Sequence, residues 1–238
     1  MNHVLIRRIS LTAASVSFCV LTAVLLVFSA VYSQISPAVA NEVVAFNPAE
    51  SDVKPLSFPI PISCTSLVVE DLAAYDGPFY EDESGREVCN VAALMLRNAG
   101  DQIVPYAHVV LHSADGTYVF DGFMIPAGAT TLIPEKNARK LSSIVVENCF
   151  GWSTVLQEND RYDISVTQTG SKELTVTNRS DVQIHDLILY HKTFLEDFGF
   201  YMGGRAFETQ IESIAPGQTV TVCPEFYAAG YSEVIYFE

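Results

Sequence analysis

Apolar and polar residues alternate along Val104–His112, where the odd-numbered positions are apolar. A period of two places successive side chains on opposite faces of a β-strand. Ala107 and Val109 share one face of the expected strand, so we expect both side chains to be buried. Val91–Leu96 is a nearly continuous apolar run, and we interpret it as a strand because the turn Asn98–Asp101 follows it.

A strand–turn–strand pattern occurs twice in the chain. Its first copy covers Asn90–Ile133, and a weaker copy begins at Glu173. Asn98 and Asn178 each close an apolar strand, and each is followed three residues later by an aspartate that opens the next strand. A unit that recurs in this way indicates two related β modules in tandem.

The second copy has its own alternating strand, Gln183–Lys192, in which Leu187 and Leu189 occupy the face expected to be buried. Short strands are separated by turns about every 8–12 residues, and no amphipathic helix interrupts them. The sequence therefore predicts an all-β fold of two tandem immunoglobulin-like β-sandwiches, the first at 63–158 and the second at 159–238.

Two segments of the second copy carry a distinctive strand-and-turn motif. Leu174–His191 reads LTVTNRSDVQIHDLILYH, and Ile214–Val222 reads IAPGQTVTV. These segments resemble the CARDB-type immunoglobulin-like modules of bacterial surface proteins, in which a Pro-Gly turn leads into a β-branched strand. The match covers Glu173–Val222 well and Asn90–Ile133 loosely, and the first copy resembles membrane-anchored bacterial surface proteins. The resemblance implies a spacer, adhesion or assembly unit, and it brings no catalytic residues.

The N-terminal segment Ile9–Ser33 contains no charged residue. It exceeds the roughly 20 residues that a membrane-spanning helix needs. Arg7 and Arg8 precede it, so the positive-inside rule predicts a cytoplasmic segment 1–8, a transmembrane anchor and an extracytoplasmic body. The alternative is a signal peptide cleaved near Ala40, which would release a secreted body. Proline-rich residues 34–62 are expected to form an extended tether.

The charge balance and the motifs exclude several function classes. The chain has 28 Asp and Glu residues against 13 Lys and Arg, a net charge of −15. Nucleic-acid binding is not expected, because phosphate contacts depend on clustered basic residues. The usual nucleophile-elbow, zinc, P-loop and dinucleotide motifs are missing from the sequence. We therefore expect neither an enzyme nor a cofactor, and a surface hydrolase remains a third alternative.

Polar candidates for metal binding have plainer interpretations. His108 and His112 lie on one strand face, but residues four apart on a strand are separated by roughly 13 Å and do not share an ion. Asp76 and Glu81–Glu83 form an acidic turn that lacks the order of an EF-hand loop. We expect ordinary surface histidines and a solvated acidic turn rather than a metal site.

The cysteines leave two alternatives. Cys64, Cys89, Cys149 and Cys223 lie in the expected body, and Cys19 lies in the expected span. An oxidising exterior permits disulfides. The expected strand order puts Cys64 and Cys149 at one pole of the first sandwich, so we predict a bond between them. The alternative is that all four thiols stay reduced.

Four aromatic residues crowd an insertion between two expected strands: Phe194, Phe198, Phe200 and Tyr201. Such rings either cap the end of a sandwich or bind a sugar or a protein partner. Our main hypothesis is a membrane-anchored, extracytoplasmic interaction or scaffold protein. The alternative is a carbohydrate- or ligand-binding module that uses the aromatic loop 194–201, so a protein or a glycan is the expected partner.

Overall fold

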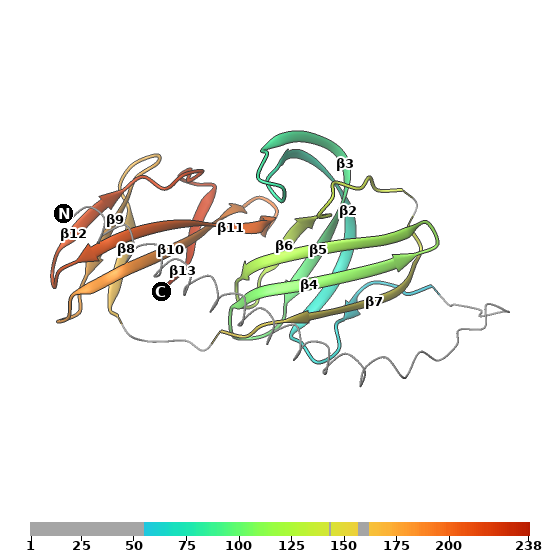
Figure 1. Ribbon diagram of the computed structural model, residues 1–238, viewed down its shortest axis with the longest axis horizontal. Coiled ribbons are helices and arrows are strands. Elements are labelled where there is room, and N and C mark those ends of the chain that lie inside the picture. Colours follow the sequence, from blue (N-terminus) through green and yellow to red (C-terminus); the bar gives the residue numbers. More distant parts are fainter. Residues whose placement is uncertain (1–54, 143, 157–161) are drawn as a thin grey trace, which may run out of the picture. The chain divides into compact units, whose positions relative to one another are not determined.

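A computed structural model describes residues 55–142, 144–156 and 162–238, and it is all-β (Figure 1). The expected transmembrane segment, 9–33, and the alternative cleavage site near Ala40 lie outside the described residues. Within the described residues there is no helix that is long and apolar enough to cross a membrane.

The strands fall into an N-terminal β unit and a C-terminal β unit. The N-terminal unit contains β1 (Ile60–Pro61), β2 (Leu67–Phe79), β3 (Arg86–Asn98), β4 (Val104–Ser113), β5 (Gly116–Ile125), β6 (Thr130–Pro134) and β7 (Val146–Ser153). The C-terminal unit contains β8 (Ile164–Gln168), β9 (Leu174–Asn178), β10 (Ile184–Leu195), β11 (Phe200–Ile214), β12 (Thr219–Val222) and β13 (Ser232–Phe237).

The two units repeat one strand order. In the N-terminal unit β3 pairs with β2 and β6, while β4 pairs with β5 and β7. In the C-terminal unit β9 pairs with β8 and β12, while β10 pairs with β11 and β13. Six strands of each unit therefore correspond one to one, from β2–β7 to β8–β13.

A parallel strand pair makes one continuous sheet across both units. Tyr201 and Met202 of β11 lie beside Thr131 and Leu132 of β6. The resulting seven-stranded sheet has the order β1-β2-β3-β6-β11-β10-β13, and Figure 1 shows the start of β11 next to β6. The insertion at 193–205 is thus the end of the β10–β11 hairpin, which reaches the N-terminal unit.

The faces expected to be buried are buried. Ala107, Val109 and Leu187 have no exposed surface, and Leu189 is 1% exposed. Ala107 and Val109 belong to a core between the two sheets of the N-terminal unit, and Leu187 and Leu189 belong to the core of the C-terminal unit. These four predictions are confirmed.

Part of the expected tether belongs to the fold. Ile60 pairs with Val69 across β1 and β2, and both Ile60 and Ile62 are buried in the N-terminal core. The prediction of an extended tether is therefore wrong for these residues. The prolines of this segment indicated an irregular tether rather than a strand. Proline is nevertheless compatible with an edge strand, and β1 is an edge strand of its sheet.

The predicted disulfide is absent, because all four cysteines in the described part of the chain are free thiols. Cys64 precedes Leu67, which pairs with Asn98 at the end of the unit where β4 begins. Cys149 pairs instead with Leu111, near the end where β4 terminates. The prediction of a Cys64–Cys149 bond was wrong because it placed both residues at one pole.

Candidate functional site

The outer face of the sheet β5-β4-β7 is covered by aromatic rings. Inward-facing residues of β4 and β5 form the core, so the intervening residues point outward. We call this surface the aromatic face, and its rings are those of Tyr106, His108, His112, Phe123, Phe150 and Trp152.

Three large apolar side chains of the aromatic face are open to solvent. Trp152 is 51% exposed, Phe150 48% and Phe123 41%. The solvent-facing side of an antiparallel sheet normally carries polar residues. A contiguous apolar patch on such a face marks an interaction site.

Tyr106 links the rings into a stripe. Its ring centre lies 5.0 Å from that of Phe123 and 5.0 Å from that of Trp152. Tyr106 faces Phe123 across β4 and β5, and Trp152 faces His108 across β7 and β4. The stripe therefore crosses all three strands of the sheet.

A hydrogen-bonded carboxylate lies beside the stripe. Asp121 accepts hydrogen bonds from the Tyr106 hydroxyl at 2.8 Å, from His108 Nδ1 at 2.7 Å and from Lys136 Nζ at 2.7 Å. Partial burial opposes ionisation of Asp121, but the bonds from Lys136 and His108 outweigh it and lower its pKa. Burial, reinforced by the bond to Asp121, raises the pKa of Tyr106 to about 12. The site therefore combines apolar rings with fixed polar groups.

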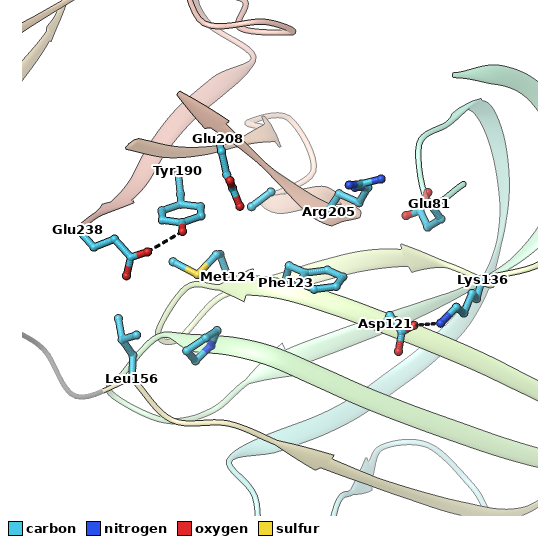
Figure 2. A pocket seen from close by; sticks show the side chains of 12 residues that line it. Glu81, Asp121, Phe123, Met124, Lys136, Leu156, Tyr190, Arg205, Glu208 and Glu238 are labelled. Carbon is cyan, nitrogen blue, oxygen red and sulfur yellow. Dashed lines mark hydrogen bonds and ion pairs between the residues drawn. The ribbon is translucent and has the colours of Figure 1, made fainter. Parts of the chain in front are cut away.

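A cavity of about 480 Å³ opens beside the aromatic face, and we call it the junction cavity. Strand β5 forms one wall through Phe123 and Met124, and β10 and β11 form the opposite wall through Tyr190 and Glu208 (Figure 2). Phe123 belongs to both the aromatic face and the junction cavity. The two surfaces are therefore continuous.

Buried Lys192 fixes the backbone around the cavity. Its side chain is fully buried, and Nζ donates to the carbonyl of Phe123 at 3.0 Å. It also donates to the three carbonyls of Gly203–Arg205 at 3.0 to 3.4 Å. Desolvation lowers the pKa of Lys192 to about 7, although the negative charge of Glu81 opposes this shift. Lys192 therefore ties β5 to β11.

The acidic turn docks on the C-terminal unit. Glu81 accepts a hydrogen bond from the Gly204 amide at 2.8 Å, and Glu83 pairs with Arg205 at 2.9 Å. Burial raises the pKa of Glu81, and the bond from the Gly204 amide partly offsets that rise. The prediction of a solvated turn was therefore wrong for Glu81. A three-residue metal-ligand cluster does not occur among the described residues.

The aromatic insertion does not present its four rings together. Phe198 is 72% exposed, whereas Tyr201 is 9% exposed. Phe194 packs on Tyr201 with ring centres 4.8 Å apart, and Phe200 packs against an apolar cluster of the N-terminal unit. Phe194, Phe200 and Tyr201 therefore lie against protein. The exposed Phe198 packs on Phe200, with ring centres 5.8 Å apart.

The histidines have separate partners. His108 bonds to Asp121, and His112 Nδ1 lies 3.0 Å from the Thr117 hydroxyl. His191 is buried against Phe207, with ring centres 5.4 Å apart, and desolvation lowers its pKa to about 4.

Comparison with known proteins gives no family for the chain. No family model matches the sequence, and no curated protein matches it.

Proposed function

We propose that this protein is a membrane-anchored, extracytoplasmic binding protein built from two immunoglobulin-like β-sandwiches, and that its aromatic face holds a neutral glycan. The repeated strand order supports the two sandwiches. Counted from β2 and from β8, each unit pairs its first, second and fifth strands with one another and its third, fourth and sixth strands with one another. The uncharged Ile9–Ser33 after Arg7 and Arg8 supports the anchor.

The observation that carries the glycan proposal is the stripe of Phe123, Tyr106 and Trp152 beside Asp121. A sugar ring has apolar C–H faces that pack on aromatic rings, and its hydroxyls need hydrogen-bond donors and acceptors at the rim. His108 bonds to Asp121 through Nδ1, which leaves Nε2 for a hydroxyl. The stripe and its polar border provide both kinds of contact.

Charge favours a neutral ligand. Asp121 is neutralised locally by Lys136, 2.7 Å away, so the stripe has no unpaired cation for an anionic sugar. The net charge of −15 also repels polyanions. An uncharged polysaccharide needs no cation to neutralise it, and the negative net charge of the protein does not repel it.

Sedimentation with insoluble neutral polysaccharides tests this function. The full-length chain should sediment with at least one of cellulose, chitin and mannan, and Trp152→Ala should lower the bound fraction at least tenfold. Phe198→Ala removes a still more exposed ring outside the aromatic face and should leave binding unchanged. Equal binding by the wild type and Trp152→Ala, or binding to none of the three polymers, would overturn the proposal.

A protein partner is the second candidate, and two exposed valines favour it. Val145 is 49% exposed and Val155 65%, and they flank β7 at its two ends. Aliphatic side chains contribute to protein interfaces but do not stack on sugars. Loss of partner binding in Val155→Asp, with polysaccharide binding absent in the wild type, would favour this candidate.

A further inference from the structure

The junction cavity has apolar walls and a polar rim. Met124 is 7% exposed and lines the cavity together with the ring of Phe123 and the side chain of Leu156. Figure 2 shows Tyr190 facing Met124 from the opposite wall. The volume of about 480 Å³ is within the range of small-molecule sites, which are roughly 300–1,000 Å³.

The two cations of the cavity already have partners. Lys136 pairs with Asp121 at 2.7 Å, and Arg205 pairs with Glu83 at 2.9 Å. Neither cation is therefore left to neutralise the other carboxylates of the cavity.

The other end of the cavity carries unneutralised negative charge. Glu208 stands opposite Tyr190 across β10 and β11, and no cation pairs with it among the described residues. Glu238 accepts a hydrogen bond from the Tyr190 hydroxyl at 2.8 Å and has no cation partner in the same part of the chain. Burial raises the pKa of Tyr190, and the charges of Glu238 and Glu208 raise it further.

We propose that the junction cavity binds an organic ammonium ion that carries an apolar group. The ammonium lies between Glu208 and Glu238, where the ring of Tyr190 adds a cation–π contact. The apolar group packs on Met124 and Phe123. Hydrocarbon walls suit an amine with an apolar group better than Ca²⁺ or Mg²⁺, because these ions need about six or more oxygen ligands and two carboxylates supply at most four.

This site is independent of the proposed glycan function, although Phe123 borders both surfaces. The glycan proposal depends on Trp152 and Tyr106, whereas the amine proposal depends on Glu208 and Glu238. Failure of one proposal therefore leaves the other standing.

Methyl NMR of the full-length chain tests the amine site directly. With ¹³C-methyl methionine, Met124 reports the cavity, and Met95, which packs in an apolar cluster of the N-terminal unit, is the reference. Phenethylammonium at pH 7 should shift the Met124 signal saturably and leave Met95 in place. The neutral analogue 2-phenylethanol has the same ring without the charge, and it should bind at least tenfold more weakly.

Variants that remove a carboxylate charge test where the ammonium group binds in the cavity. Glu208→Gln and Glu238→Gln should each weaken phenethylammonium binding at least fivefold. Glu212→Gln, at an exposed position on the same strand, is the matched control and should bind as the wild type does. A Met124 signal that does not move, or that moves equally with both probes, overturns the proposal without any variant. Equal binding by Glu208→Gln and Glu212→Gln overturns it as well.

Discussion

Asn98 and Asn178 occupy equivalent buried positions in the two units. Each side chain is fully buried, and each Nδ2 donates to at least two backbone carbonyls, one of which lies across the turn that follows. For Asn98 the acceptors include Gln102 at 2.8 Å, and for Asn178 they are Val182 at 2.8 Å and Ile214 at 3.0 Å. The sequence repeat therefore corresponds to one repeated structural feature. In each unit a buried asparagine at the end of a strand hydrogen-bonds to the backbone of the following turn.

Replacing Asn178 should destabilise the fold. Asn178→Ala removes the donor to the buried Ile214 carbonyl and the acceptor of the Ser180 amide, and each unsatisfied buried group costs about 1–3 kcal/mol. We expect the free energy of unfolding in urea to fall by about 2–4 kcal/mol. Asn148→Ala, at an exposed position, is the control and should change it by less than about 0.5 kcal/mol. Equal effects of the two variants would contradict a structural role for Asn178.

Lys192 should make stability depend on pH. Its pKa is about 7 in the folded protein and 10.5 without burial, so the unfolded state binds the extra proton between these values. The contribution of Lys192 to the free energy of unfolding therefore rises as the pH increases from 7 to 10.5, and it is constant below pH 7. Lys192→Met removes the titration.

Urea unfolding of both proteins at pH 7, 8.5 and 10 measures this effect. The stability of the wild type relative to Lys192→Met should increase with pH across the series. A difference that stays constant or falls would show that burial does not depress the Lys192 pKa.

Thiol reactivity should follow exposure. Cys64, Cys89 and Cys223 are exposed, whereas Cys149 is half-buried and burial raises its pKa to about 11. Alkylation by iodoacetamide at pH 8 should therefore modify Cys149 at least tenfold more slowly than Cys64, because the thiolate is the reactive form. Mass spectrometry of native protein follows each site, and a Cys64–Cys149 peptide under non-reducing conditions would show that the strand order is wrong.

Local patterns predicted the strands well. The period-two alternation of Val104–His112 identified β4 and its buried face, and the same pattern identified Leu187 and Leu189. The repeat of Asn98 and Asn178 indicated two related units because each asparagine ends an apolar strand. These signals lie within a few residues of one another, so they can be detected in a single sequence.

Long-range register was not predictable from these patterns. Trp152 reaches the aromatic face only because β7 pairs with β4 and sets it opposite His108. Lys192 is buried directly after buried His191 because the β10 register shifts between His191 and Thr193, which breaks the alternation. The outward Tyr and His residues of β4 were the one local sign of the aromatic face.

The fluorescence of Trp152 reports glycan binding at the aromatic face, because Trp152 is the only tryptophan of the chain and lies in the proposed glycan stripe. Full-length protein is titrated with neutral hexasaccharides of glucose, mannose and N-acetylglucosamine. We expect a saturable change in emission with at least one of them. Binding should be at least tenfold weaker in Phe123→Ala and unchanged in Phe198→Ala. Constant emission with all three sugars would contradict the claim that the aromatic face binds a neutral glycan.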